Sequence, residues 1–295
     1  FFKDLLNENI IRNDDKGKQC NICYENNYLL KLNCCEKSIC WTCSLKCYLN
    51  DFNKCNYCRR EINVNPILIK LENLTSTKNN FYNQFCKNPR KLLVIGIDGL
   101  RPDAFLYANT PNFDKLIQNS SFNFETIVET DTISGPSWAT IFSGKLQKET
   151  KVYFNEDVED NNYIWKTNDI FSELNKININ TNAFANDWIG MKNMIQNSKN
   201  IKYVSNEDCF KSDKEIIEYT NNHILSVNND DFTFMYLNGV DNYGHKYGFS
   251  IQSEEYVNYI EQIDAIIKDL LNNSIKNNWS IMIVTDHGGC VKSDL

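Results

Sequence analysis

The stretch KLLVIGIDGL, residues 91–100, decides how the larger part of this chain folds. Its apolar run at residues 92–97 is typical of a short strand that is buried on both faces of a parallel sheet. Asp98 follows at the carboxyl end of this strand, where ligands of open α/β sheets bind. A buried carboxylate is costly without a cationic partner, so Asp98 is a candidate ligand-binding residue. The alternative is that Asp98 caps the next turn.

Beyond this first strand, strand-like and helix-like apolar patterns alternate along the chain. Such alternation predicts an α/β domain with a mainly parallel sheet flanked by helices. We expect further strands at residues 122–129, 177–184, 232–237 and 280–285. We expect helices at residues 110–118, from about residue 136, and at residues 169–176, 211–227 and 253–271, the last of which packs on the sheet.

Three of the expected strands are followed by carboxylate or imidazole side chains, namely Asp98, Asp241 with His245, and Asp286 with His287. The chain has only three histidines, and the third, His223, lies inside a helical pattern and is interpreted as ordinary. Imidazole and carboxylate together suit zinc or a similar divalent ion. Two such ions about 3.5–4 Å apart can hold the entering and leaving oxygens of a phosphoryl transfer.

The block TDTISGPSWATIFSG, residues 130–144, supplies a candidate nucleophile. Its apolar second half predicts a helix that begins near Pro136, with Ser134 at or just before the helix N-terminus. Backbone N–H groups at such an end favour an anion and help to activate a hydroxyl placed there. The alternative reading of Ser134 is an ordinary helix cap.

Four blocks in order, IGIDGLRPD, TISGPSWATIFSG, DNYGH and TDHGG, resemble the alkaline phosphatase superfamily, and within it the type I phosphodiesterase/nucleotide pyrophosphatase family. The resemblance covers residue 91 to the end of the chain. It implies a metal-dependent phosphoric ester hydrolase with two catalytic zinc ions. The implied substrate is a small-molecule phosphate ester, with nucleotides among the candidates, and these motifs do not identify the leaving group.

The resemblance also implies roles for individual residues. Asp98, Asp286 and His287 would hold one zinc, and Asp241 and His245 would hold the other. Ser134 would be the nucleophile, with its oxygen on the first zinc, and Thr132 is a poorer candidate two residues earlier. Asn155 lies where the family uses an asparagine to hold a phosphate oxygen.

Two departures from the family pattern bear on this site. The family takes a third histidine for its second zinc from a segment well beyond the DHG block, and no histidine follows His287 before Leu295. We expect either a chain that is incomplete at its C-terminus or a site that is one ligand short. Thr150-Lys151 also replaces a His-Gly pair of the family.

The cysteines are clustered near the N-terminus, with nine of the twelve lying between Cys20 and Cys58. Three CxxC pairs within so short a stretch predict zinc binding and a reducing compartment. The stretch resembles a RING finger, in which ligands alternate between two structural zinc ions. The resemblance implies one site made of Cys20, Cys23, Cys40 and Cys43, and a second made of Cys35 or Cys34 with Cys55 and Cys58.

The RING-like pattern lacks one ligand, because Lys37 stands near the place of the usual histidine. Cys34 or Cys47 could be the fourth ligand of the second ion, or that site could be degenerate. The surface that would face a ubiquitin-conjugating enzyme corresponds to Ile22, Leu49, Phe52 and Arg59. The resemblance thus implies an E3 ubiquitin ligase or another protein-interaction module.

These patterns divide the chain into an N-terminal segment at residues 1–15, a RING-like zinc module at 16–65, a linker at 66–90 and the hydrolase-like domain at 91–295. The net charge of −7 argues against a general nucleic-acid-binding surface. No membrane span or signal peptide is recognised. The zinc thiolates favour a cytoplasmic location, although many relatives of the hydrolase-like domain act outside the cytosol.

Two other functions compete with the hydrolase reading. A sulfatase is suggested by Ser134-Gly135-Pro136-Ser137, but Trp138 replaces the arginine of the sulfatase motif and Asp98-Gly99 replaces its paired aspartates. The second is a non-catalytic adaptor or ubiquitin ligase whose phosphatase-like domain is a remnant.

Overall fold

The structure, a computed structural model, describes residues 29–31, 38–40, 91–124, 126–129, 132–160, 162–226 and 231–289. The chain forms two compact units, residues 1–81 with 118–121 and residues 82–117 with 122–295. In the first unit, strands β1 (Leu29–Lys31) and β2 (Ser38–Cys40) pair antiparallel, with Leu29 opposite Cys40.

The predicted zinc module lies almost wholly outside the described residues. Of its candidate ligands, only Cys40 falls in a described strand, and the others lie outside the described residues: Cys20, Cys23, Cys34, Cys35, Cys43, Cys47, Cys55 and Cys58. The predicted linker at 66–90 and the positions expected to face a ubiquitin-conjugating enzyme also lie outside them. The RING-like interpretation therefore remains a prediction from sequence.

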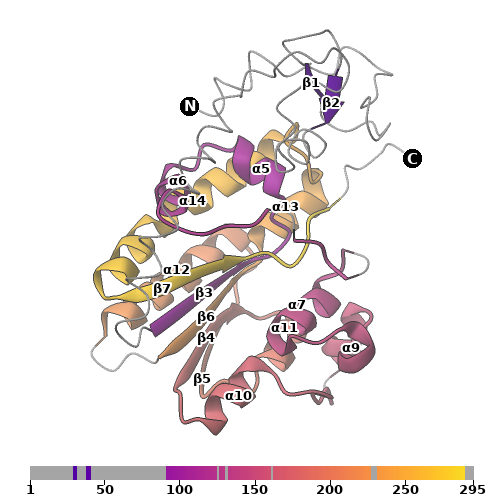
Figure 1. Ribbon diagram of the computed structural model, residues 1–295, viewed down its shortest axis with the longest axis vertical. Coiled ribbons are helices and arrows are strands. Elements are labelled where there is room, and N and C mark those ends of the chain that lie inside the picture. The colour runs from indigo at the N-terminus through magenta and orange to yellow at the C-terminus, as the bar shows by residue number, and fades with distance from the viewer. Residues whose placement is uncertain are drawn as a thin grey trace. The chain divides into compact units, whose positions relative to one another are not determined.

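The second unit is built on a five-stranded sheet in the order β5-β4-β6-β3-β7, and all neighbouring strands run parallel (Figure 1). The strands are β3 (Lys91–Ile97), β4 (Thr181–Asn186), β5 (Asn200–Val204), β6 (Phe232–Leu237) and β7 (Trp279–Val284). Each residue of β4 and β6 is buried, as expected for strands covered on both faces. The predicted α/β fold with a parallel sheet is confirmed.

Helices cover both faces of this sheet (Figure 1). One face carries α5 (Pro102–Tyr107), α6 (Pro111–Ile117), α12 (Cys209–Leu225), α13 (Gly239–Tyr247) and α14 (Glu254–Lys276). The other carries α7 (Ser134–Ser143), α9 (Asn155–Glu159), α10 (Ile170–Lys176) and α11 (Ile189–Met194), and a short α8 (Gln147–Thr150) follows α7.

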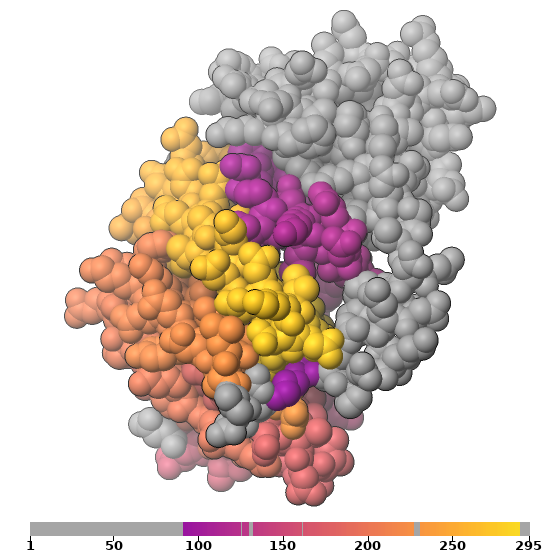
Figure 2. Space-filling view, turned by 90° about the vertical axis from the view of Figure 1, so that its left-hand side faces the viewer, coloured from indigo at the N-terminus to yellow at the C-terminus, as the bar shows by residue number. Residues whose placement is uncertain are grey.

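Strand β3 contributes to both apolar cores. Leu93, Ile95 and Ile97 belong to the core under α14, whereas Val94 packs with the residues of α7. Its pairing with β7 places Lys91 opposite Trp279, which joins an early and a late part of the sequence. Figure 2 shows the late segments, in orange and yellow, beside a small purple patch from the start of this domain.

The apolar residues of helix α14 are spaced so that they form one buried face. Apolar residues recur every three or four positions, and Tyr256, Ile260, Ile263 and Ile267 are each at most 1% exposed. The Ser253 side chain accepts a hydrogen bond from the Tyr256 N–H and so caps the helix start. The predicted helix at 253–271 is confirmed and continues to Lys276. Among the described helices, none is both long and apolar enough to cross a membrane.

Several predicted elements were wrong or incomplete. The described residues between 122 and 129 form no strand, because Phe124 packs on Phe105 while Ile127 is 88% exposed. Strand β4 begins at Thr181 rather than at residue 177, after a turn in which Asn178 has a φ of 59°. Strand β5 and helices α5, α8, α9, α11 and α13 were not predicted. His223 lies in α12 between the rings of Phe184 and Trp279, as an ordinary packing residue.

The start of α13 is packed so closely that it predicts the effect of one substitution. A Cβ at Gly239 would overlap the Tyr259 hydroxyl and lie 2.6 Å from Asp213 Oδ2. We therefore expect Gly239→Ala to lower the free energy of unfolding by about 1–3 kcal/mol, measured from urea denaturation followed by circular dichroism. Gly144→Asn is the control, because Gly144 has a φ of 63° that asparagine tolerates and open space around it. An unchanged urea midpoint for Gly239→Ala would contradict this packing.

Candidate active site

The candidate site lies at the carboxyl edge of the sheet, where β3, β6 and β7 end. Asp98 follows β3 directly, and Asp286 and His287 follow β7 after Thr285. Asp241 enters through α13, which begins two residues after β6 ends. Because parallel strands end at a common edge, residues far apart in sequence meet there.

Gly99 makes the close approach of these segments possible. Its φ of 66° is in the left-handed region, and a Cβ there would lie 2.7 Å from Asp241 Oδ1. The Gly99 N–H donates to Asp286 Oδ1 at 3.1 Å. The turn after β3 therefore contacts the segments that follow both neighbouring strands.

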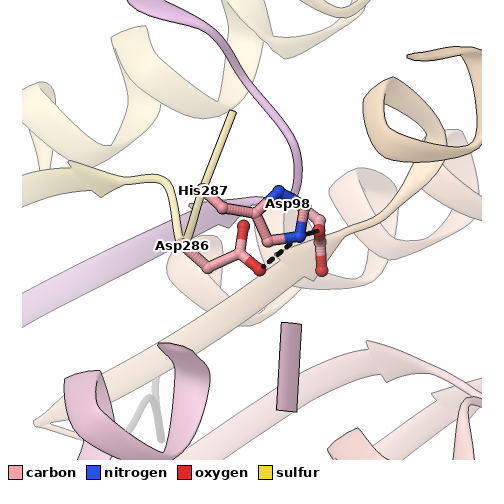
Figure 3. Close-up of side chains that lie close together, drawn as sticks. All are labelled: Asp98, Asp286 and His287. Carbon is pink, nitrogen blue, oxygen red and sulfur yellow. Dashed lines mark ion pairs between the residues drawn. The ribbon is translucent and has the colours of Figure 1, made fainter. Parts of the chain in front are cut away.

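Asp98, Asp286 and His287 form the centre of the site (Figure 3). One ligand atom from each residue lies within 4.8 Å of the other two, and all three side chains are buried. His287 Nε2 lies 3.5 Å from Asp98 Oδ1 and 3.3 Å from Asp286 Oδ2. Figure 3 shows the imidazole directed toward both carboxylates. These three residues could hold a metal ion.

Ser134 is the first residue of α7, slightly earlier than the predicted helix start, and its hydroxyl reaches this centre. Ser134 Oγ lies 3.0 Å from His287 Nε2 and donates to Asp98 Oδ1 at 3.4 Å. Thr132, the other hydroxyl considered, is an exposed residue in a bend. Between the two hydroxyls, only Ser134 has described contacts with the centre.

Asn155 lies beside Ser134 at the start of α9. Its side-chain oxygen accepts a hydrogen bond from the Gly135 N–H at 2.7 Å. A Cβ at Gly135 would lie 3.0 Å from that oxygen, so the glycine keeps the two segments close. Since the carbonyl end of the Asn155 amide is used by Gly135, its NH₂ end is the part that can donate to an anion.

Asp241 and His245 form a second pair at the rim of the site. They lie four residues apart on one face of α13, with His245 Nε2 3.4 Å from Asp241 Oδ2. The His245 side chain is 70% exposed, whereas that of Asp241 is 14% exposed. Asp241 Oδ1 lies 4.0 Å from His287 Nε2, so the pair adjoins the buried centre. The sequence pattern placed these residues after a strand, but not within a helix.

Among the described residues, the carboxylates of the site form ion pairs with the imidazoles of His287 and His245, which are charged only when protonated. Asp286 Oδ2 and Asp241 Oδ1 are buried and accept no hydrogen bond from the described residues. Burial and the charge of Asp98 raise the pKa of Asp241 to about 8, and the same causes raise the pKa of Asp286 well above its ordinary value. A cation among these oxygens would relieve both effects. Carboxylates with imidazole are a donor set that fits Zn²⁺ or Mn²⁺.

Sequence patterns missed the residues that support these side chains. Asp98 Oδ2 accepts hydrogen bonds from Trp138 Nε1 at 3.0 Å and from the Tyr236 hydroxyl. Arg101 Nη1 donates to the carbonyls of Phe249 and Gly289, at 2.6 and 2.9 Å. Trp138 and Tyr236 stand in apolar runs, where the pattern indicates only burial. A polar atom in such a run, which needs a buried partner, was the available signal.

The profile of the family described as type I phosphodiesterase / nucleotide pyrophosphatase matches residues 92–290. No curated protein was found to match the chain.

Three similar solved structures are of ectonucleotide pyrophosphatase/phosphodiesterase 5. The murine protein, solved alone and as an inactive form with AMP, has a TM-score of 0.55 and 20% identity over 70% of this chain and 59% of that chain. The human protein has a TM-score of 0.52 and 17% identity over 68% of this chain and 57% of that chain. This chain therefore spans less than two thirds of either relative, and the likeness shows the fold.

The family profile covers more than half of the chain, including the segments that carry Asp98, Ser134, Asp241 and His287. The likeness to the solved structures covers a similar share of the chain and shows the same α/β fold. This chain therefore belongs to the type I phosphodiesterase / nucleotide pyrophosphatase family.

Proposed function

We propose that this chain is a metal-dependent phosphodiester hydrolase that uses Ser134 as its nucleophile. The observation that carries the proposal is the position of Ser134 Oγ, 3.0 Å from His287 Nε2 and 3.4 Å from Asp98 Oδ1. This hydroxyl stands beside buried carboxylate oxygens that have no hydrogen-bond partner among the described residues. A hydroxyl next to a cation-binding cluster suits nucleophilic attack on a phosphate ester.

The metal ligands follow from the same arrangement. Asp98, Asp286 and His287 would hold one ion, and Asp241 with His245 would contribute to a second. A divalent cation there would supply positive charge that lowers the pKa of the serine hydroxyl and stabilises negative charge on the phosphoryl oxygens. Zinc is the ion we propose, because imidazole and carboxylate both suit it.

The side chains of this chain then divide the reaction between them. Ser134 Oγ gives up its proton and attacks phosphorus in line with the ester bond, that bond breaks, and the leaving oxygen takes up a proton as the alcohol or nucleotide departs. Water then attacks the phosphorus of the serine-bound phosphodiester, the bond from phosphorus to Ser134 Oγ breaks, that oxygen takes up a proton, and a phosphate monoester is released. The Gly135 N–H at the start of α7 is held by Asn155 and the Ser137 N–H bonds the Ile133 carbonyl, so the helix start contributes to the anion site through its dipole rather than through these N–H groups. The Asn155 NH₂ group donates to a phosphoryl oxygen, since Gly135 holds the other end of that amide.

We propose a small phosphate ester as substrate, with nucleotides as the first class to test. The proposal of a nucleotide is supported by the inactive murine relative, which was solved in complex with AMP. The RING-like module at residues 16–65 is proposed as a zinc-bound protein-interaction or E3 ligase module. Its support is the three CxxC pairs of the sequence.

Ser134→Ala tests the nucleophile. We expect kcat for bis(nitrophenyl) phosphate to fall by about 10⁴-fold or more, because the attacking oxygen is removed. Two hydroxyl deletions nearby are matched controls, namely Thr132→Ala and Ser137→Ala, and both should retain activity. Hydrolysis that survives in Ser134→Ala but fails in Thr132→Ala would identify Thr132, and not Ser134, as the nucleophile. A metal-loaded wild type without any activity would favour the non-catalytic adaptor.

Metal binding should release protons, and Mn²⁺ is the probe because thiolates of the cysteine module select softer ions. The raised pKa of Asp241, about 8, means that an approaching cation displaces a proton near neutral pH. Affinity for Mn²⁺ should therefore rise as pH increases from 6 to 8, by up to about tenfold per unit for each proton released. Calorimetry in two buffers of different ionisation enthalpy measures the proton count.

A substitution in the site tests where Mn²⁺ binds. Asp286→Asn should weaken Mn²⁺ binding by about 10–100-fold or more, since even a supporting residue of a metal ligand has an effect of that size. Asp269→Asn, at an exposed position of α14, is the charge-matched control and should bind Mn²⁺ as the wild type does. Equal affinities for the two variants would place the metal elsewhere.

A further inference from the structure

We infer that Trp138 and Tyr236 are positioning residues that leave Asp98 one oxygen for metal binding and align Ser134 with it. This inference rests on the proposed function, because it concerns how the same site is assembled. It assigns a role to two aromatic side chains whose polar atoms donate to Asp98 Oδ2.

The two oxygens of Asp98 have different surroundings. Oδ2 accepts hydrogen bonds from Trp138 Nε1 and from the Tyr236 hydroxyl. Oδ1 faces the site, 3.5 Å from His287 Nε2 and 3.4 Å from Ser134 Oγ. Two donors fix the orientation of a carboxylate group, so Oδ1 alone is presented to a cation.

All three partners of this arrangement are buried. Asp98 is 1% exposed, Trp138 is fully buried and Tyr236 is 2% exposed. Water cannot replace a donor that is lost from such a site without entering the core. The orientation of Asp98 therefore depends on these two side chains rather than on solvent.

Trp138 also connects the carboxylate to the nucleophile. It lies four residues after Ser134, one turn further along α7, so both side chains project toward the end of β3. A helix held to Asp98 through the indole at 3.0 Å keeps its first residue at a fixed place relative to the same carboxylate. Trp138 thus couples the position of the nucleophile to the position of a metal ligand.

A glycine in β3 provides the space that the Trp138 ring needs to reach Asp98. Gly96, two residues before Asp98 on β3, lies against the Trp138 ring, and a Cβ there would lie within 2.5 Å of Trp138 Cη2. The indole packs edge-on against the rings of Phe234 and Tyr236, with centroids 5.9 and 5.4 Å away. This packing holds the indole N–H toward Oδ2.

The test compares two site variants with two matched controls in the full chain. Tyr236→Phe and Trp138→Phe each remove one donor to Asp98. Tyr203→Phe and Trp165→Phe remove a tyrosine hydroxyl and an indole N–H that bond to the backbone carbonyls of Lys192 and Met194 instead. The readouts are the Kd for Mn²⁺, from the paramagnetic resonance of free ion, and kcat and KM at saturating Mn²⁺.

We expect both site variants to raise the Kd for Mn²⁺ by about 10–100-fold, and both controls to leave it unchanged. We expect Trp138→Phe also to lower kcat with KM unchanged, because the nucleophile loses its alignment while substrate binding remains. Tyr236→Phe keeps the shape of the ring, so it remains informative if Trp138→Phe does not fold.

The contrary results are distinct from those that would defeat the proposed function. Site variants that keep the wild-type Kd and kcat, while Asp286→Asn loses Mn²⁺ binding, would overturn the positioning role and leave the metal site standing. A rise in Kd that is equal in the controls would reduce Trp138 and Tyr236 to general packing residues and overturn the role too. Unchanged Mn²⁺ binding in Asp286→Asn would overturn both the metal site and this inference.

Discussion

The burial of several carboxylates around one imidazole is the constraint on which the rest of the site depends. Asp98 and Asp286 are almost fully buried, and Asp241 is mostly so. Like charges in a low-dielectric environment oppose ionisation, as the raised pKa values of Asp241 and Asp286 reflect. A group of this kind is stable when a cation shares its oxygens. The same cation would activate the hydroxyl of Ser134 in the proposed reaction, so the buried carboxylates that are costly for folding would also provide the chemistry.

The parallel sheet is what makes such a cluster possible. The hydrogen bond from Gly99 to Asp286 joins residues 187 positions apart in the sequence, and it forms because β3 and β7 are neighbours that end at the same edge. Small residues set the spacing at this edge. Gly99 admits Asp241, and Gly96 admits the indole of Trp138. The close approach of backbone segments thus assembles the site, and Trp138 and Tyr236 in the aromatic core beneath it support the carboxylate of Asp98.

Much of the fold was predictable because local patterns carry it. Residues 91–97 and 232–237 alternate with helical segments, and their ends had to converge once the sheet was parallel. Strand β5 was missed because it is an edge strand whose residues Asn200 and Lys202 are exposed, so its apolar signal is weak. The helix α13 was missed because Gly239 and Gly244 disfavour helix locally, and packing in the folded domain overrides that preference. The bonds from Trp138 and Tyr236 to Asp98 are long-range contacts that no local pattern encodes.

The most direct test of the proposed metal site is anomalous X-ray diffraction from crystals of the chain grown with Zn²⁺. We predict an anomalous peak about 2.0–2.2 Å from ligand atoms of Asp98, Asp286 and His287, with Ser134 Oγ directed toward it. Anomalous density confined to the cysteine-rich segment, with none between Asp98 and His287, would contradict the account.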